Sequence, residues 1–143
     1  MAFYIKVKGS FPGKHYWPGA PERFQELRKL HEHTFHFVAE IQVDHPREIE
    51  FLEVAQQITQ RLVGELQSQP YWSCEEMARA LFRWLDGGWR STPAGRVVST
   101  EVNEDGGCGA VYRPDQEIEP PFPYTTVTVL HGKAIEVPSE GGD

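Results

Sequence analysis

A chain of 143 residues, 39% hydrophobic and 24% charged, predicts a single globular domain with one hydrophobic core. The net charge of −7 argues against nucleic-acid binding, because neutralising phosphates requires a basic surface, and no apolar run is long enough to span a membrane. The alternating N-terminus predicts a strand and no signal peptide, and two cysteines do not suggest a disulfide scaffold, so we expect a cytoplasmic protein with free thiols.

Two strands are predicted in the first third of the chain. Residues 3–8 alternate, with Phe3, Ile5 and Val7 on one face, which is typical of a half-buried strand. Gly and Pro interrupt the segment that follows, which predicts a bulged strand leaving into a loop. Residues 31–43 carry the clearest strand pattern. The apolar residues that share one of its faces are Phe35, Phe37, Ala39, Ile41 and Val43.

The hydrophobic period then changes from two residues to about 3.6, which predicts two helices. The first is expected after Asp44, His45 and Pro46, which mark its start. Its apolar stripe comprises Phe51, Ala55, Ile58, Leu62 and Leu66. Ser73 and Glu76 can form a capping box at the start of the second helix, and "DGG" at 86–88 ends it. The buried stripe expected for this helix is Met77, Leu81, Trp84 and Leu85.

Two hairpins are predicted in the last third of the chain. Strands at 96–104 and 108–113 flank a tight turn, and strands at 124–130 and 134–137 flank a second turn. The fold class is therefore α+β, with an antiparallel four-stranded sheet, two helices on one face and an extra C-terminal hairpin. We expect one domain over residues 1–138, with its core at 3–113, the extra hairpin at 122–137 and a disordered tail at 139–143.

Histidines gather where the second predicted strand begins. His31 and His33 are two positions apart, so both can point at one ion. Zinc in catalytic sites commonly takes three protein ligands. If the first two strands pair as a hairpin, His15 lies beside this pair, whereas His36 has the opposite parity. The predicted zinc site is therefore His15, His31 and His33; the alternative is three surface or core histidines without a metal.

The segments around these histidines resemble the 6-pyruvoyltetrahydropterin synthase and 6-carboxytetrahydropterin synthase family. "FPGKH" followed by "LHEH" is similar to the family's F-x-x-x-H and H-G-H motifs. "EIEFLEV", "SCEEMARALFRWL" and "EVNEDGGCGAVYR" follow at family-like spacing, so the resemblance covers roughly residues 3–113. It implies a tunnelling fold, Zn²⁺ on the three histidines, a homo-oligomer (trimer or hexamer) and a small-molecule pterin or purine-like ligand held by Glu104.

Glu104 ends the strand predicted at 96–104, on the same parity as Val98 and Val102. Its carboxylate would therefore leave the apolar face at the rim of the sheet. There it can accept two parallel hydrogen bonds from the ring N–H and exocyclic amine of a pterin or guanine. The alternative is a solvated turn carboxylate beside Asp105.

The chain departs from the family in its acid–base residues. Leu27 occupies the position of the family's catalytic cysteine, the Asp-His pair before the second helix is missing, and Glu32 replaces the middle glycine of H-G-H. Cys74 and Cys108 are weak candidates for a substitute base. Cys74 is expected at a helix N-terminus, where the dipole lowers a thiol pKa. The alternative is that both cysteines are inert and packed.

Three functions follow from these observations. The first is a zinc-dependent pterin lyase-like enzyme with rearranged acid–base residues, acting on a pterin or purine-derived substrate. The second is a catalytically inactive zinc-containing protein that binds or sequesters such a ligand, and the third is a structural protein without a ligand. The predicted zinc ligands and Glu104 favour the first function over the third. The missing acid–base residues predict weak or absent standard synthase activity and keep the second function open.

Overall fold

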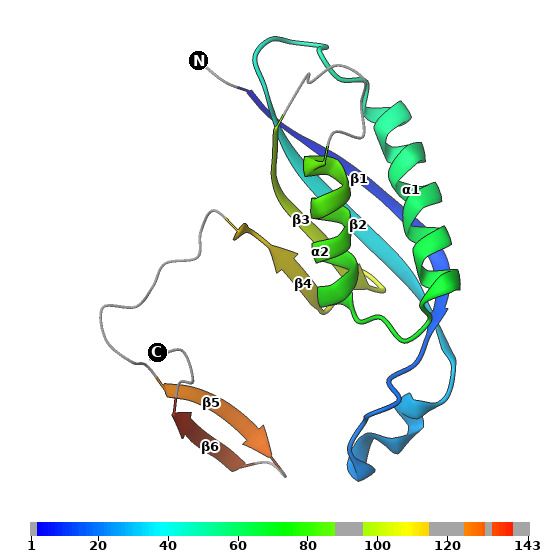
Figure 1. The fold of residues 1–143 in the computed structure, drawn as a ribbon, viewed down its shortest axis with the longest axis vertical. Coiled ribbons are helices and arrows are strands. Elements are labelled where there is room, and N and C mark those ends of the chain that lie inside the picture. The colour runs from blue at the N-terminus through cyan, green and yellow to red at the C-terminus, as the bar shows by residue number, and fades with distance from the viewer. Residues whose placement is uncertain (1–2, 88–95, 115–124, 131–132, 139–143) are drawn as a thin grey trace.

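The computed structural model describes residues 3–87, 96–114, 125–130 and 133–138. Four antiparallel strands form one sheet in the order β1 (Phe3–His15), β2 (His31–Val43), β3 (Arg96–Glu104) and β4 (Gly109–Tyr112). Helices α1 (Phe51–Ser68) and α2 (Cys74–Asp86) pack on one face of this sheet (Figure 1). A short 3-10 helix, η1 (Glu22–Arg28), lies in the connection between β1 and β2. The predicted α+β class, with two helices on an antiparallel four-stranded sheet, is confirmed.

Strand β1 is longer than its sequence predicts. It pairs with β2 in unbroken register from Phe3 opposite Val43 to His15 opposite His31, so the predicted bulge is wrong and the loop begins only after His15. Pro12 is compatible with this strand because β1 is the edge of the sheet, where a missing N–H need not break a ladder. The continuous register brings His15 to the beginning of β2.

Strand β2 begins and ends where its alternation predicts. Its apolar face is buried against the helices, with Phe35 fully buried and Phe37 only 1% exposed. Val7 and Phe11 of β1 and Val102 of β3 extend the same buried surface. The hydrophobic core therefore lies between one face of the sheet and the two helices.

Helix α1 begins after Glu50, whose side chain caps it by accepting a hydrogen bond from the backbone N–H of Leu52. The helix therefore begins at Phe51, later in the chain than the start predicted directly after Asp44, His45 and Pro46. The buried stripe comprises Val54, Ile58, Leu62 and Leu66. Because this stripe begins one turn into the helix, Phe51 is 52% exposed and its predicted burial is wrong. Ala55 is only partly buried against the core.

Helix α2 begins with the predicted capping box. The Ser73 hydroxyl accepts from the Glu76 backbone N–H at 3.2 Å, and the Glu76 carboxylate accepts from the Ser73 backbone N–H at 3.2 Å. The predicted residues Met77, Leu81 and Leu85 are buried, while Trp84 is only partly buried. The helix ends at Asp86 with Gly87 as its C-cap, as expected.

A tight turn joins β3 and β4. Asp105 and Gly106 both have positive φ, at 56° and 74°, the combination required by a type I′ hairpin turn. The predicted turn is therefore confirmed. Glu104 shares its parity with the fully buried Val102, as predicted. Its expected parity with Val98 is wrong, because a register shift between β2 and β3 leaves Val98 half-buried.

The two strands of the C-terminal hairpin, β5 (Thr125–Leu130) and β6 (Lys133–Pro138), pair antiparallel as a separate two-stranded sheet. The start of the predicted hairpin segment at 122–124 and the tail predicted at 139–143 lie outside the described residues. In the part of the chain that the structure describes, the helices are too short or too polar to cross a membrane.

Candidate metal and ligand site

Three histidines meet at one end of the sheet. His15 ends β1, and His31 and His33 begin β2. The ring centroids are 4.6 Å apart for His15 and His31, 5.2 Å for His15 and His33, and 5.0 Å for His31 and His33. One ligand atom from each ring lies within 4.8 Å of the others, which is close enough for all three to hold one metal ion. The predicted trio therefore comes together, and zinc as the metal stays a prediction.

Each of the three rings has its Nδ1 atom engaged by an acceptor. The acceptors for His15, His31 and His33 are the Trp72 carbonyl at 2.9 Å, the Lys29 carbonyl at 2.8 Å and the Asp105 carboxylate at 2.8 Å. Since these oxygens only accept, each Nδ1 carries the hydrogen, and a neutral ring keeps its lone pair on Nε2. Burial lowers the pKa of His15, which favours the neutral ring that a metal requires.

Asp105 is a site residue that the sequence analysis considered only as part of a turn. Its Oδ2 accepts from the Nδ1 of His33 at 2.8 Å, and its Oδ1 accepts from the backbone N–H of Thr34 at 2.9 Å. The hydrogen bond from His33 lowers the pKa of Asp105. The signal that could have found this residue is the β2–β3 register, in which Glu104 lies opposite Phe35 and the following turn reaches His33.

Glu104 faces the same three rings. Its Oε1 lies 3.2 Å from the Nε2 of His15, and its Oε2 lies 3.4 Å from the Nε2 of His33. The Cys74 thiol donates a hydrogen bond to Oε1 at 3.9 Å. A carboxylate in these contacts is not a purely solvated turn group. Its role as a ring anchor stays a prediction.

All six candidate residues of the sequence analysis line one cavity of about 570 Å³: His15, His31, His33, Cys74, Glu104 and Cys108. Four aromatic residues that could stack on a flat ring also line it: Tyr16, Trp17, Tyr71 and Trp72. The volume lies within the range of about 300–1,000 Å³ that is usual for small-molecule sites. The cavity therefore has room for a bicyclic ring next to the histidines.

The two cysteines differ in their surroundings. Burial raises the pKa of Cys74 to about 12, and the negative charges of Glu104 and Glu75 act in the same direction. This is opposite to the lowering that its place at the start of α2 predicts. A protonated thiol is a poor general base. Cys108 is exposed and reaches the same cavity from the β3–β4 turn.

Two of the remaining histidines lie outside the cluster. His36 has the opposite strand parity, as predicted, and pairs with Ser10 and Asn103 on the neighbouring strands. His45 is an exposed residue that contacts Glu48 at 3.1 Å. His131 lies outside the described residues.

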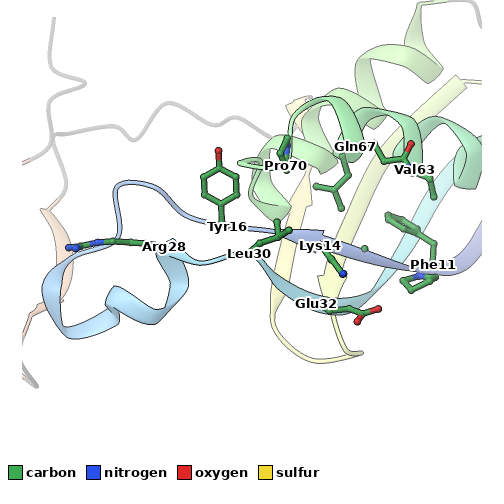
Figure 2. A pocket seen from close by; sticks show the side chains of 12 residues that line it. Phe11, Lys14, Tyr16, Arg28, Leu30, Glu32, Val63, Gln67 and Pro70 are labelled. Carbon is green, nitrogen blue, oxygen red and sulfur yellow. The ribbon is translucent and has the colours of Figure 1, made fainter.

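A larger cavity, of about 710 Å³, lies beside β1 and α1 (Figure 2). Lys14 of β1 and Glu32 of β2 line it and are direct partners in the β1–β2 register. Of the described residues that line this cavity, only Tyr16 also lines the histidine cavity, and no cluster of metal ligands is found among them. The histidine cluster therefore lies in the smaller of these two cavities.

Neither a scan against models of protein families nor a search of curated proteins finds a match to this chain. The likeness to the tetrahydropterin synthases therefore stays a resemblance of motifs. A functional assignment has to rest on the geometry of the histidine cavity.

Proposed function

We propose that this protein is a zinc-dependent pterin lyase-like member of the 6-pyruvoyl/6-carboxytetrahydropterin synthase family, with a tunnelling fold, acting on a pterin or purine-derived substrate. One observation carries the proposal. Three imidazoles whose Nδ1 atoms are already engaged lie within ligand distance of one another, in a cavity that also contains Glu104. Histidines oriented in this way by hydrogen bonds are typical of metal ligands.

The chain's own residues would divide the work as follows. His15, His31 and His33 would hold the ion, which when bound would polarise an oxygen of the substrate. Glu104 would accept hydrogen bonds from the N–H groups of the ring and fix its orientation. The aromatic side chains of the cavity would stack on the ring faces and exclude water.

A second function has specific support. Leu27 lines the histidine cavity, where the family has its cysteine, and burial keeps the Cys74 thiol protonated. A protein with these residues would bind a pterin or purine-like ring without the usual proton transfer. The second candidate is therefore a catalytically inactive, zinc-containing protein that sequesters such a ligand.

The proposal extends to partners and compartment. We expect a cytoplasmic homo-oligomer, without a nucleic-acid or membrane partner. Support for the oligomer comes from the sheet, since β1 and β4 are its two outer strands and an outer strand presents unpaired backbone groups.

Calorimetry with guanine and a reduced pterin tests the ligand class. We expect the wild type to bind such a ring, and Glu104→Gln to lose this binding while still taking up one zinc ion per chain when zinc is saturating. Mass spectrometry of small molecules that co-purify with the protein would name the ring. No affinity of the wild type for any such ring, or equal affinity in Glu104→Gln, would contradict the assignment of Glu104 and of the ligand class.

A further inference from the structure

Glu104 lies at the distance of a metal ligand from two of the histidines. Two ligands about 2.0–2.1 Å from one tetrahedral zinc ion are about 3.3 Å apart. The oxygens of Glu104 lie 3.2 Å from the Nε2 of His15 and 3.4 Å from the Nε2 of His33. Oε1 therefore has the spacing of a fellow zinc ligand from the Nε2 of His15, and Oε2 has it from the Nε2 of His33.

Between neutral imidazole rings and the carboxylate, these contacts are not hydrogen bonds. The Nδ1 atoms of His15 and His33 donate to Trp72 and Asp105, so neutral rings turn the lone pairs of their Nε2 atoms toward Glu104. The side chain of His15 is only 9% exposed, and its Nε2 has no hydrogen-bond partner. A lone pair on Nε2 and the carboxylate oxygen that it faces repel each other. A cation between them would convert both repulsions into attractions.

The charges at the site also favour Glu104 as a metal ligand. Three neutral imidazoles leave the two positive charges of a divalent ion uncompensated. Two carboxylates are close enough to balance them, Glu104 beside the Nε2 atoms and Asp105 through its hydrogen bond to His33. This set of donors, three nitrogens and one oxygen, suits zinc.

We infer that Glu104 is the fourth ligand of the metal while no ring is bound, and that a bound ring takes this carboxylate away from the metal. The inference rests on the proposed function, because it uses the same carboxylate for both partners. In this exchange one carboxylate–metal bond is lost and hydrogen bonds from the ring are gained. The fourth position of the metal, closed in the free protein, then becomes open, as catalytic zinc sites require.

The test compares wild type with Glu104→Gln, a substitution that keeps the size of the side chain and removes its charge. Glu32→Gln is the matched control, because Glu32 stands between His31 and His33 in sequence but lines the other cavity (Figure 2). Zinc affinity is measured by chelator competition, and the coordination of the ion by visible absorption of the Co²⁺-loaded protein. Far-UV circular dichroism of each metal-free variant checks that it is folded. Glu104→Ala serves as a second variant if Glu104→Gln is not folded.

We expect Glu104→Gln to bind zinc at least about tenfold more weakly than wild type, the lower end of the loss seen when even an outer partner of a metal ligand is removed. Its Co²⁺ spectrum should differ from that of wild type. Guanine should shift the wild-type spectrum and leave that of Glu104→Gln unchanged. Glu32→Gln should match the wild type in every measurement.

Three results would overturn the inference. The first is a Glu104→Gln protein with the zinc affinity and Co²⁺ spectrum of Glu32→Gln; if it still loses guanine binding, the proposed function stands without the fourth ligand. The second is a wild-type Co²⁺ spectrum that does not respond when guanine binds, which would refute the exchange. A wild type that binds no metal would contradict both the inference and the proposed zinc site.

Discussion

The carboxylate of Asp105 holds the ring of His33 through a hydrogen bond of 2.8 Å from Nδ1 to Oδ2. Asp105 reaches this ring from the β3–β4 turn, where its φ of 56° places it in the left-handed region. Its second oxygen accepts from the backbone N–H of Thr34, which ties the turn to β2. The bond fixes which nitrogen of His33 carries hydrogen and leaves the other nitrogen free for a metal.

Asp105→Asn is expected to weaken zinc binding by about 10–100-fold, the usual effect of losing such a partner. Asparagine tolerates the left-handed conformation, so the turn should persist, but an NH₂ group, which only donates, replaces one of the two oxygens that accept from His33 and Thr34. Chelator competition measures the affinity. Glu48→Gln is the control, because Glu48 contacts the exposed His45 away from the site. Equal zinc affinity in Asp105→Asn and wild type would show that His33 needs no such support.

Two leucines of α1 test the position of the core. Leu62 is fully buried, whereas Leu52 is 75% exposed on the same helix. Leu62→Ala should lower the free energy of unfolding by about 2–5 kcal/mol, because it opens a cavity in the core. Leu52→Ala should change it by no more than about 0.5 kcal/mol. Urea unfolding measures both variants, and similar losses in the two would mean that α1 packs by another face.

Turnover of dihydroneopterin triphosphate by the wild type is expected to be weak or absent. By the resemblance of motifs, Leu27 stands where the tetrahydropterin synthases have a cysteine, and a positioned acid–base group typically contributes about 10²–10⁴-fold to a rate. A steady-state assay of the zinc-loaded protein with the standard synthase substrate measures this. Robust turnover would contradict the prediction and would make Cys74 or Cys108 the first residue to test as a substitute base.

A homo-oligomer is expected because both outer strands of the four-stranded sheet, β1 and β4, present backbone groups without a partner strand among the described residues. Strand β1 is thirteen residues long, which makes its free edge an extended one. Light scattering at micromolar concentration measures the mass in solution. A monomer under these conditions would contradict the proposed oligomer and its tunnelling assembly. The site would then consist of residues from one chain.

Most of the fold could be predicted from periodicity, and the exceptions have physical causes. The bounds of β2 and the Ser73 capping box followed from local patterns. The length of β1 did not, because Gly9 looks like an interruption. In the structure a Cβ atom at Gly9 would lie 2.4 Å from Cζ of Phe37, so this glycine makes room for an aromatic ring and does not end the strand.

The site was predictable where strand parity decides it. His15, His31 and His33 follow from alternation and one hairpin register. Asp105 could not be found in this way, since its contact with His33 depends on the register of β3 and on a left-handed turn residue. The raised pKa of Cys74 was also missed, because the burial of its thiol and its contact with Glu104 are properties of the packed structure.

The zinc content of protein purified without a His tag tests the central claim most directly. His31→Ala removes a proposed ligand, while His45→Ala removes an exposed histidine outside the cluster and serves as its control. Elemental analysis should find about one zinc ion per chain in the wild type and in His45→Ala. It should find a large loss in His31→Ala. Zinc far below one ion per chain in the wild type, or the same content in His31→Ala, would contradict the account.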